Sequence, residues 1–121
     1  MATIVHFELP SADVDRAKGF WSGVFGWTFA GMEGPFEYLM TQNEEPVGAI
    51  FQSEDAGSGP IVYFDTGDID ATLESVREHG GEAGEKQPIP TIGWFARCKD
   101  TEGNSFSLFQ TDDTVPGDFG G

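Results

Sequence analysis

The chain has 121 residues, with 6 Lys and Arg against 21 Asp and Glu, which gives a net charge of −15 at neutral pH. This charge excludes a nucleic-acid-binding surface, because phosphate binding needs clustered Lys and Arg. Leu, Ile, Val and Phe make up about 23 % of the residues, more than in disordered chains, so residues 1–121 are expected to fold as one domain.

The sequence carries no sign of export or of a membrane segment. No run of 18 apolar residues is present, and the N-terminus MATIVHFELP has neither a basic leader nor an apolar signal core. We therefore expect a cytoplasmic protein without membrane contact. Cys98 is the single cysteine, which excludes an intrachain disulfide and a cysteine-based metal site, and its apolar surroundings predict a packed, inert thiol.

The acidity has two interpretations. A halophilic protein spreads carboxylates over its whole surface and avoids Lys, whereas a trap for a cationic ligand concentrates them in one cleft. Acidic residues are spread along this chain and Lys occurs three times, which favours the halophilic interpretation.

The first half of the chain has the pattern of one strand, one helix and three strands. Polar and apolar residues alternate over residues 4–9, so His6 and Glu8 share one strand face. Ser11 or Asp13 can cap a helix that ends at Gly26. The apolar stripe of this helix comprises Val14, Ala17, Trp21 and Val24. Short strands are predicted at residues 27–30, 36–40 and 47–52.

The second half repeats this order after a polar linker at residues 53–59. A strand at residues 61–65 precedes a helix that starts at residues 68–70 and stops at Gly80 and Gly81. Further strands are predicted at residues 82–87, 92–99 and 105–110, with a hairpin turn at residues 100–104. An offset of 55 superimposes the two helix starts, Asp13-Val14-Asp15 on Asp68-Ile69-Asp70, and maps Gly26 onto Gly81.

The repeat predicts an α+β fold of two tandem βαβββ modules, residues 3–52 and residues 60–111, followed by a flexible acidic tail at residues 112–121. A helix covers one face of each sheet, and two such sheets side by side would form a concave, partly closed barrel-like cleft.

Three stretches carry a family resemblance: VHFELPSADVDRAKGFWSGVFGW, IVYFDTGDIDATLESVREHGG and GWFARCKDTEGNSFSLFQ. With them the sequence resembles the vicinal-oxygen-chelate superfamily, which includes glyoxalase I, extradiol dioxygenases, fosfomycin-modifying enzymes and bleomycin-sequestering proteins. In particular it resembles a small branch described as related to lactoylglutathione lyase. This resemblance implies the two-module fold, while the activity must be argued from the site.

The resemblance also implies where the family's divalent metal would bind. The four ligand positions fall on His6, Gln52, Ile61 and Ser107. His6 is the one retained candidate, since a divalent cation needs several imidazole or carboxylate ligands and the other three side chains supply none. We therefore expect no cofactor. The alternative is a weakly held divalent metal with Glu8 beside His6.

The remaining site candidates lie on predicted strands. A carboxylate from Glu8 could raise the pKa of His6 and fix its tautomer for general-base catalysis, or the two could satisfy one another at the edge of the core. Tyr63 and Trp94 could contact a ligand or pack in the core. Arg97 could bind a carboxylate or phosphate, or pair with an acid such as Glu8 or Glu37.

Two functions follow from this pattern. The first is a binding module that holds a small organic molecule in an aromatic-lined cleft without metal, as drug-sequestering relatives do. The second is a lyase, isomerase or dioxygenase that uses His6 as metal ligand or general base. With either function we expect a homodimer, since the resemblance implies pairing of subunits and the chain has many aromatic residues that could form an interface.

Overall fold

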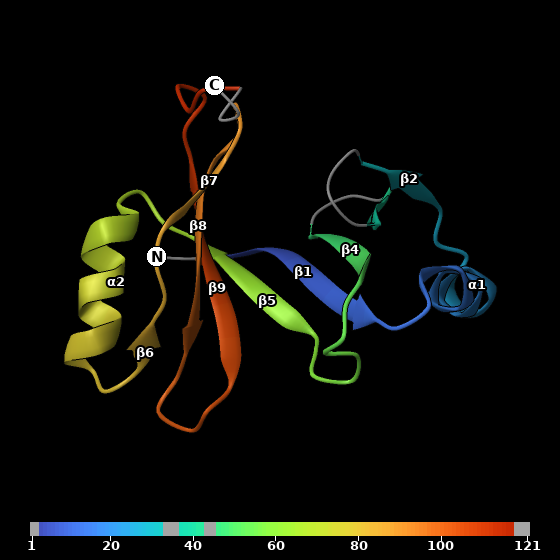
Figure 1. Cartoon of the computed structure of the whole chain (residues 1–121), viewed down its shortest axis with the longest axis horizontal. Coiled ribbons are helices and arrows are strands. Elements are labelled where there is room, and N and C mark those ends of the chain that lie inside the picture. The colour runs from blue at the N-terminus through green and yellow to red at the C-terminus, as the bar shows by residue number, and fades with distance from the viewer. Residues whose placement is uncertain (1–2, 33–36, 43–45, 118–121) are drawn as a thin grey trace. The chain divides into compact units, whose positions relative to one another are not determined.

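A computed structural model describes residues 3–32, 37–42 and 46–117. By contact density the chain forms two compact units, Val5–Val62 and Met1–Ile4 with Tyr63–Gly121. Its elements in chain order are β1 (Ile4–Ser11), α1 (Val14–Phe25), β2 (Phe29–Gly31), β3 (Tyr38–Thr41), β4 (Val47–Gln52), β5 (Ile61–Asp65), α2 (Ile69–Glu78), β6 (Glu82–Ala83), β7 (Gln87–Ile89), β8 (Gly93–Lys99) and β9 (Ser105–Thr111) (Figure 1). The predicted βαβββ repeat is therefore confirmed.

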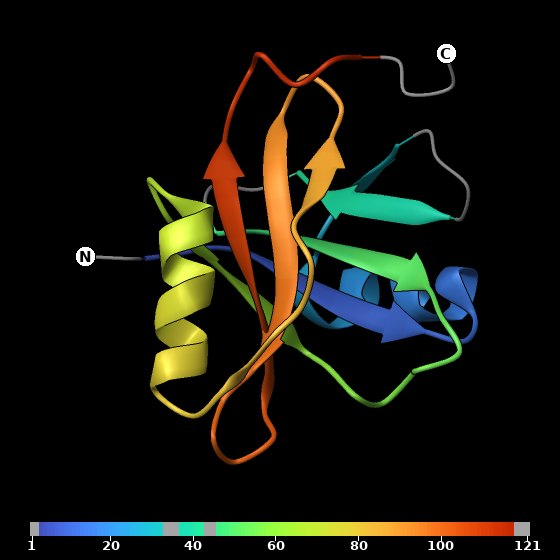
Figure 2. The same ribbon diagram turned by 60° about the vertical axis from the view of Figure 1, so that its left-hand side comes forward.

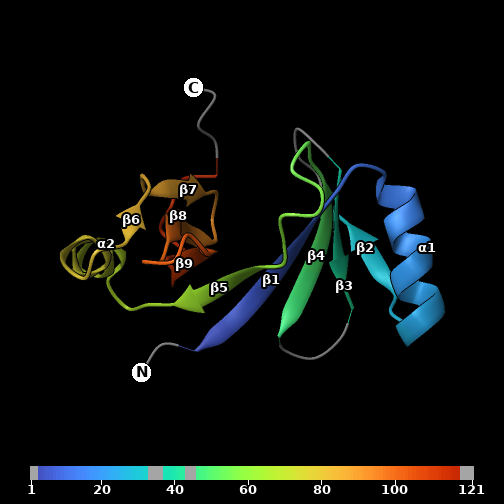
Figure 3. The ribbon, with the colours of Figure 1, turned by 90° about the horizontal axis from the view of Figure 1, so that it is seen from below.

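The first module has the strand order β2-β3-β4-β1. β1 and β4 run parallel, while β3 is antiparallel to both β2 and β4. α1 lies beside β2, β3 and β4 (Figure 3). On this helix-covered face a Cβ on Gly48 would come within 2.0 Å of the Phe7 ring, so only glycine fits at this crossing.

Both helices begin at the predicted aspartates. The Asp13 carboxylate accepts a hydrogen bond from the Arg16 amide, and the Asp68 carboxylate accepts one from the Ala71 amide, each at 3.0 Å. These bonds satisfy amides that no helical carbonyl reaches. α1 ends at Gly26 in the left-handed conformation, as predicted.

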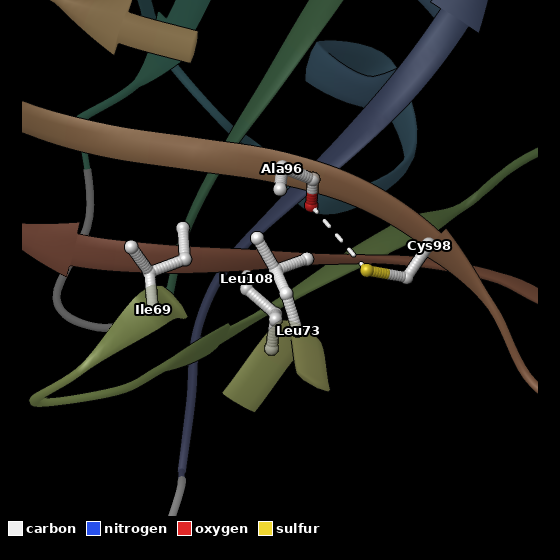
Figure 4. Close-up of a cluster of buried hydrophobic side chains, with 5 residues drawn as sticks. All are labelled: Ile69, Leu73, Ala96, Cys98 and Leu108. Carbon is white, nitrogen blue, oxygen red and sulfur yellow. Dashed lines mark hydrogen bonds between the residues drawn. The ribbon is translucent and has the colours of Figure 1, made fainter. Parts of the chain in front are cut away.

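The second module has the strand order β5-β9-β8-β6, with β7 paired to β8. α2 lies along one face of this sheet (Figure 2). Its buried core comprises Ile69, Leu73, Ala96, Cys98 and Leu108 (Figure 4). Burial raises the pKa of the Cys98 thiol, so it stays protonated and packs as a small apolar group, in agreement with the prediction of an inert thiol.

One predicted strand of the second module is divided in two. The predicted strand at residues 82–87 is interrupted, and its continuation, β7, includes Pro88. A Cβ on Gly84 would lie 2.5 Å from the Arg97 carbonyl oxygen, so the backbone bends where only glycine fits. Pro88 is tolerated because β7 lies off the main strand path and pairs with β8 alone.

Two further features differ from the expected pattern. Of the predicted α1 stripe, Val14 is buried but Val24 is 57 % exposed. Residues 112–117, expected to be a loose tail, fold back on the second module: the Thr91 amide donates to the Val115 carbonyl, and the Val115 side chain is buried. Burial of this valine supplies the anchoring that an acidic, glycine-rich composition does not reveal. Among the described residues, no helix is long and apolar enough to cross a membrane.

Candidate functional site

The face of the first module that carries His6 and Glu8 is opposite the face covered by α1. Phe7, between them in β1, packs against Trp27, whose ring stacks on Trp21 of α1. Because side chains alternate along a strand, His6 and Glu8 point to the helix-free face. The predicted pairing of the two residues on one strand face is therefore present.

Tyr38 of β3 joins His6 and Glu8 into one hydrogen-bonded cluster. The Tyr38 hydroxyl donates to Glu8 Oε2 at 2.7 Å and is hydrogen-bonded to His6 Nε2 at 2.8 Å, while His6 Nε2 and Glu8 Oε2 lie 4.0 Å apart. The Glu8 side chain is 7 % exposed and the His6 side chain 18 %. The hydroxyl thus separates the imidazole from the carboxylate and can relay a proton between them.

The balance of effects on His6 favours the neutral imidazole. Burial lowers the His6 pKa, and this outweighs the opposing effects of the Glu8 charge and of a backbone hydrogen bond with Val47. Glu8 raises this pKa, as expected from the sequence, but desolvation is the larger effect. A neutral imidazole can accept a proton, which a general base requires.

The sequence did not reveal Tyr38 as a site residue. Tyr38 lies 30 residues from Glu8 along the chain, and it reaches the cluster only because β3 pairs with β4 and β4 pairs with β1. From the sequence, Tyr38 is only a polar aromatic residue inside a predicted strand, and that does not indicate which residues its hydroxyl contacts.

Beside His6 and Glu8, strand β4 carries no polar side chain on the helix-free face. In the parallel register His6 is opposite Val47, Glu8 opposite Ala49 and Pro10 opposite Phe51, so β4 presents hydrocarbon to the helix-free face. Within the part of the chain that the structure describes, no three His, Cys, Asp or Glu side chains lie close enough to hold an ion. A protein site needs three or four such ligands.

Gln52, the second expected ligand position, does not join His6. Gln52 is paired with Ser11 of β1. Because side chains alternate along a strand, Ser11 lies on the same face as Phe7, which is the helix-covered face. The Gln52 side-chain amide donates to the Ala12 carbonyl at 2.7 Å. The third position, Ile61, is buried and offers no donor atom.

In the second module the structure brings Ser107 and Arg97 together on one face. They are register partners in the β8–β9 pair. Their neighbours Ala96 and Leu108 belong to the core under α2, so Ser107 and Arg97 lie on the helix-free face. Phe64 of β5 packs against the same core. Its neighbour Tyr63 therefore lies on the helix-free face with Ser107 and Arg97. Tyr63 is 6 % exposed, and Arg97 is exposed.

Ser107 is the unusual group of this face. Its side chain is fully buried, and its hydroxyl oxygen has no hydrogen-bond partner among the residues that the structure describes. Buried hydroxyls without partners are rare, because each loses its bonds to water without replacement. Among the described residues, nothing compensates the Ser107 hydroxyl for this loss.

Trp94, in contrast, lies on the other side of β8. It packs against the core under α2, and its indole nitrogen donates to Asp112 Oδ2 at 3.1 Å. The Lys86 ammonium lies 4.6 Å above the ring. This placement gives Trp94 a role in holding the segment after β9 and does not join it to Arg97 and Ser107.

The two modules, each with a helix on one face and polar groups on the other, define a protein of the glyoxalase/bleomycin resistance/dioxygenase fold. Solved structures agree. Hypothetical protein BH1468 from Bacillus halodurans has a TM-score of 0.73 at 13% identity, with 94% of this chain and 97% of that chain covered. Methylmalonyl-CoA epimerase from Mycobacterium tuberculosis has a TM-score of 0.68 at 14% identity, with 90% and 87% covered. A glyoxalase/bleomycin resistance protein/dioxygenase superfamily member from Vibrio splendidus has a TM-score of 0.64 at 21% identity, with 91% of this chain and 99% of that chain covered.

Sequence comparisons give the family. A glyoxylase-like domain-containing protein of Didymella fabae is 32% identical over 114 residues, covering 84% of this chain and 88% of that protein. Residues 3–42 match the family model of the bleomycin resistance protein-like N-terminal region. The chain belongs to the glyoxalase/bleomycin resistance/dioxygenase superfamily, as the resemblance implied. Putative glyoxylase CFP32 of Mycobacterium bovis is 30% identical over 114 residues, covering 89% of this chain, which spans 44% of that protein's length.

Proposed function

We propose that the protein binds a small organic molecule through the helix-free faces of its modules, without a divalent metal. The observation that carries this proposal is the Ser107 hydroxyl, which is buried without a partner. An unpaired buried hydroxyl costs about 1–3 kcal/mol, a cost that a ligand atom bonded to it would remove. We extend the proposal to an aromatic lining of the site. Its support is the pair of rings Tyr38 and Phe51 on the helix-free face of the first module, whose centroids are 6.1 Å apart.

Arg97 and Tyr63 complete the proposed binding face of the second module. A guanidinium beside a hydroxyl suits a carboxylate or another oxyanion, because both donors can bond to one acidic group. In a chain with a net charge of −15, a cation here also lowers the repulsion that an anionic ligand would meet.

The second candidate function is an enzyme: a lyase, isomerase or dioxygenase of the same superfamily. One observation favours it. The Tyr38 hydroxyl bridges His6 and Glu8, an arrangement that can take a proton from a bound substrate at His6 and pass it to Glu8. This candidate needs His6 for turnover, whereas the binding module does not.

A thermal-shift experiment separates metal from organic ligands. Zn²⁺, Ni²⁺ and Mn²⁺ alone, bleomycin alone, and a panel of small organic acids are each added to the purified protein, and its metal content is measured. Ligands that bind the folded state raise the melting temperature. We expect an organic compound to do so and the ions not to. Stoichiometric bound metal, or stabilisation by the ions alone, would contradict the proposal.

The variant His6→Ala then separates binding from catalysis. Under the binding proposal it retains most of the melting-temperature shift given by the organic compound. Under the enzyme proposal wild-type protein turns that compound over, and His6→Ala does not. Product formation followed by mass spectrometry distinguishes the two.

The same proposal covers the setting of the protein. We propose that it is a cytoplasmic homodimer with an acidic surface adapted to high salt. Its support is the spread of carboxylates along the chain and the scarcity of Lys.

A further inference from the structure

α1 carries a large apolar face that no described part of the chain covers. Phe20 is 58 % exposed, Val24 57 % and Phe25 59 %. Within this helix Val14 is the buried residue, so most of its apolar surface faces outward. Exposed aromatic residues gathered on one helix are typical of an interaction surface.

The exposed rings are held in place by a stack of aromatic residues. Trp21 stacks on Trp27 with ring centroids 5.2 Å apart, and Phe25 lies 5.7 Å from Trp21 and 5.5 Å from Trp27. Phe20 meets Trp21 edge to face at 5.3 Å. Rings fixed in this way lose little conformational freedom when another surface covers them, so they suit a binding role.

The charge distribution indicates what can cover this face. Residues 19–32 contain no charged side chain, although the chain as a whole carries −15. A basic or acidic partner would find no opposite charge here. Two copies of this chain, in contrast, repel each other over most of their surface and can approach most easily where charge is absent.

The surface of α1 is also complementary to itself. Phe20 and Val24 are four residues apart and form a ridge, while Gly19 and Gly23 beside them form a groove. A Cβ added at either glycine would meet nothing within 4 Å. A ridge next to a groove on one helix allows the ridge of each copy to enter the groove of the other, as a two-fold contact requires.

The ends of α1 favour an antiparallel arrangement. A helix carries partial positive charge at its start and partial negative charge at its end. Two parallel copies of α1 would place like ends side by side, whereas two antiparallel copies place opposite ends together.

We infer that α1 is the interface of a homodimer, in which two α1 helices pack antiparallel through Phe20, Val24 and Phe25. This inference rests on the homodimer proposed above and assigns it a surface. An exposed phenylalanine contributes about 100 Å² to such a contact, so the three side chains of both copies together bury roughly 600 Å², which is less than a stable specific interface buries and is typical of a weak association. The dimer should therefore dissociate upon dilution.

Sedimentation equilibrium across a hundredfold range of protein concentration in concentrated KCl tests this assignment. Wild-type protein is expected to be dimeric at the upper end of the range and to dissociate at the lower end. Val24→Glu should be monomeric throughout, because two carboxylates would be buried at the centre of the contact. Ile92→Glu is the matched control: Ile92 is 43 % exposed, in the second module, and should leave the dimer intact.

A second variant should weaken the dimer without lowering the stability of the monomer. Gly23→Leu fills the groove but meets no atom of its own chain, and Leu favours helix over Gly. We expect its monomer to melt at or above the wild-type temperature, while its dimer weakens at least tenfold.

The outcomes are distinguishable. Wild-type protein that stays monomeric at every concentration would overturn both the homodimer and its interface. A dimer that persists in both Val24→Glu and Gly23→Leu, with the fold verified by circular dichroism, would overturn the α1 interface and leave the homodimer in place.

Discussion

The substitution Ser107→Ala tests whether the second module is built to receive a ligand. The serine side chain is 0 % exposed, and no described residue forms a hydrogen bond with its hydroxyl. Its removal recovers the cost of an unsatisfied buried hydroxyl, about 1–3 kcal/mol. The cavity left by one oxygen atom takes back about 0.5 kcal/mol. The ligand-free variant should therefore be more stable than wild type by about 0.5–2.5 kcal/mol.

The same substitution should weaken binding. A ligand bonded to the hydroxyl loses about 1 kcal/mol, or about a fivefold change in affinity, when the hydroxyl is absent. Urea unfolding measures the stability, and calorimetric titration with the organic compound found by thermal shift measures the affinity. Ser105→Ala is the control, because Ser105 is an exposed residue on the same face of β9. It should change stability by less than about 0.5 kcal/mol.

Two results would refute this reasoning. A Ser107→Ala variant less stable than wild type would mean that the hydroxyl already has a partner in the folded chain. A variant that is more stable but binds with wild-type affinity would mean that the hydroxyl does not contact the ligand.

Three further predictions concern charge and the end of the chain. In the unfolded chain His6 takes up a proton near its ordinary pKa of 6.5, whereas in the folded protein burial lowers the pKa of His6. Stability should therefore fall as pH drops below about 6.5, and His6→Gln should remove that part of the pH dependence in urea unfolding. Asp112→Asn weakens an acceptor for the Trp94 indole, so the indole proton should exchange faster with solvent by nuclear magnetic resonance. Because carboxylate repulsion is screened by salt, the melting temperature should rise steadily with KCl concentration; a fall would contradict the halophilic interpretation.

The elements that local chemistry determines could be predicted from the sequence. The helix starts at Asp13 and Asp68 follow from a side chain that bonds an amide three residues ahead. The end of α1 at Gly26 follows from the left-handed conformation that glycine tolerates. In each case both partners lie within a few residues of each other.

Features that depend on strand register could not be predicted. The place of Tyr38 between His6 and Glu8 depends on which residues of β3, β4 and β1 are opposite one another. Gln52 needed the same information, because a one-residue change in pairing moves a side chain to the other face of a sheet. Trp94 is on the α2 side of β8 while Arg97 is on the opposite side, and neither composition nor spacing indicates which face a helix covers.

The two modules have the same helix N-caps but differ in the polar groups on their helix-free faces. The N-cap bonds of α1 and α2 match at an offset of 55, with Asp13 and Asp68 as the acceptors. In the first module, however, the polar groups of the helix-free face bond to one another through Tyr38. A ligand that bonds to His6 must compete with that hydroxyl, so its net gain is small. At Ser107 a ligand breaks no bond within the chain. The larger loss of affinity should therefore come from Ser107→Ala rather than from His6→Ala, even though the family resemblance implies a metal-ligand position at His6.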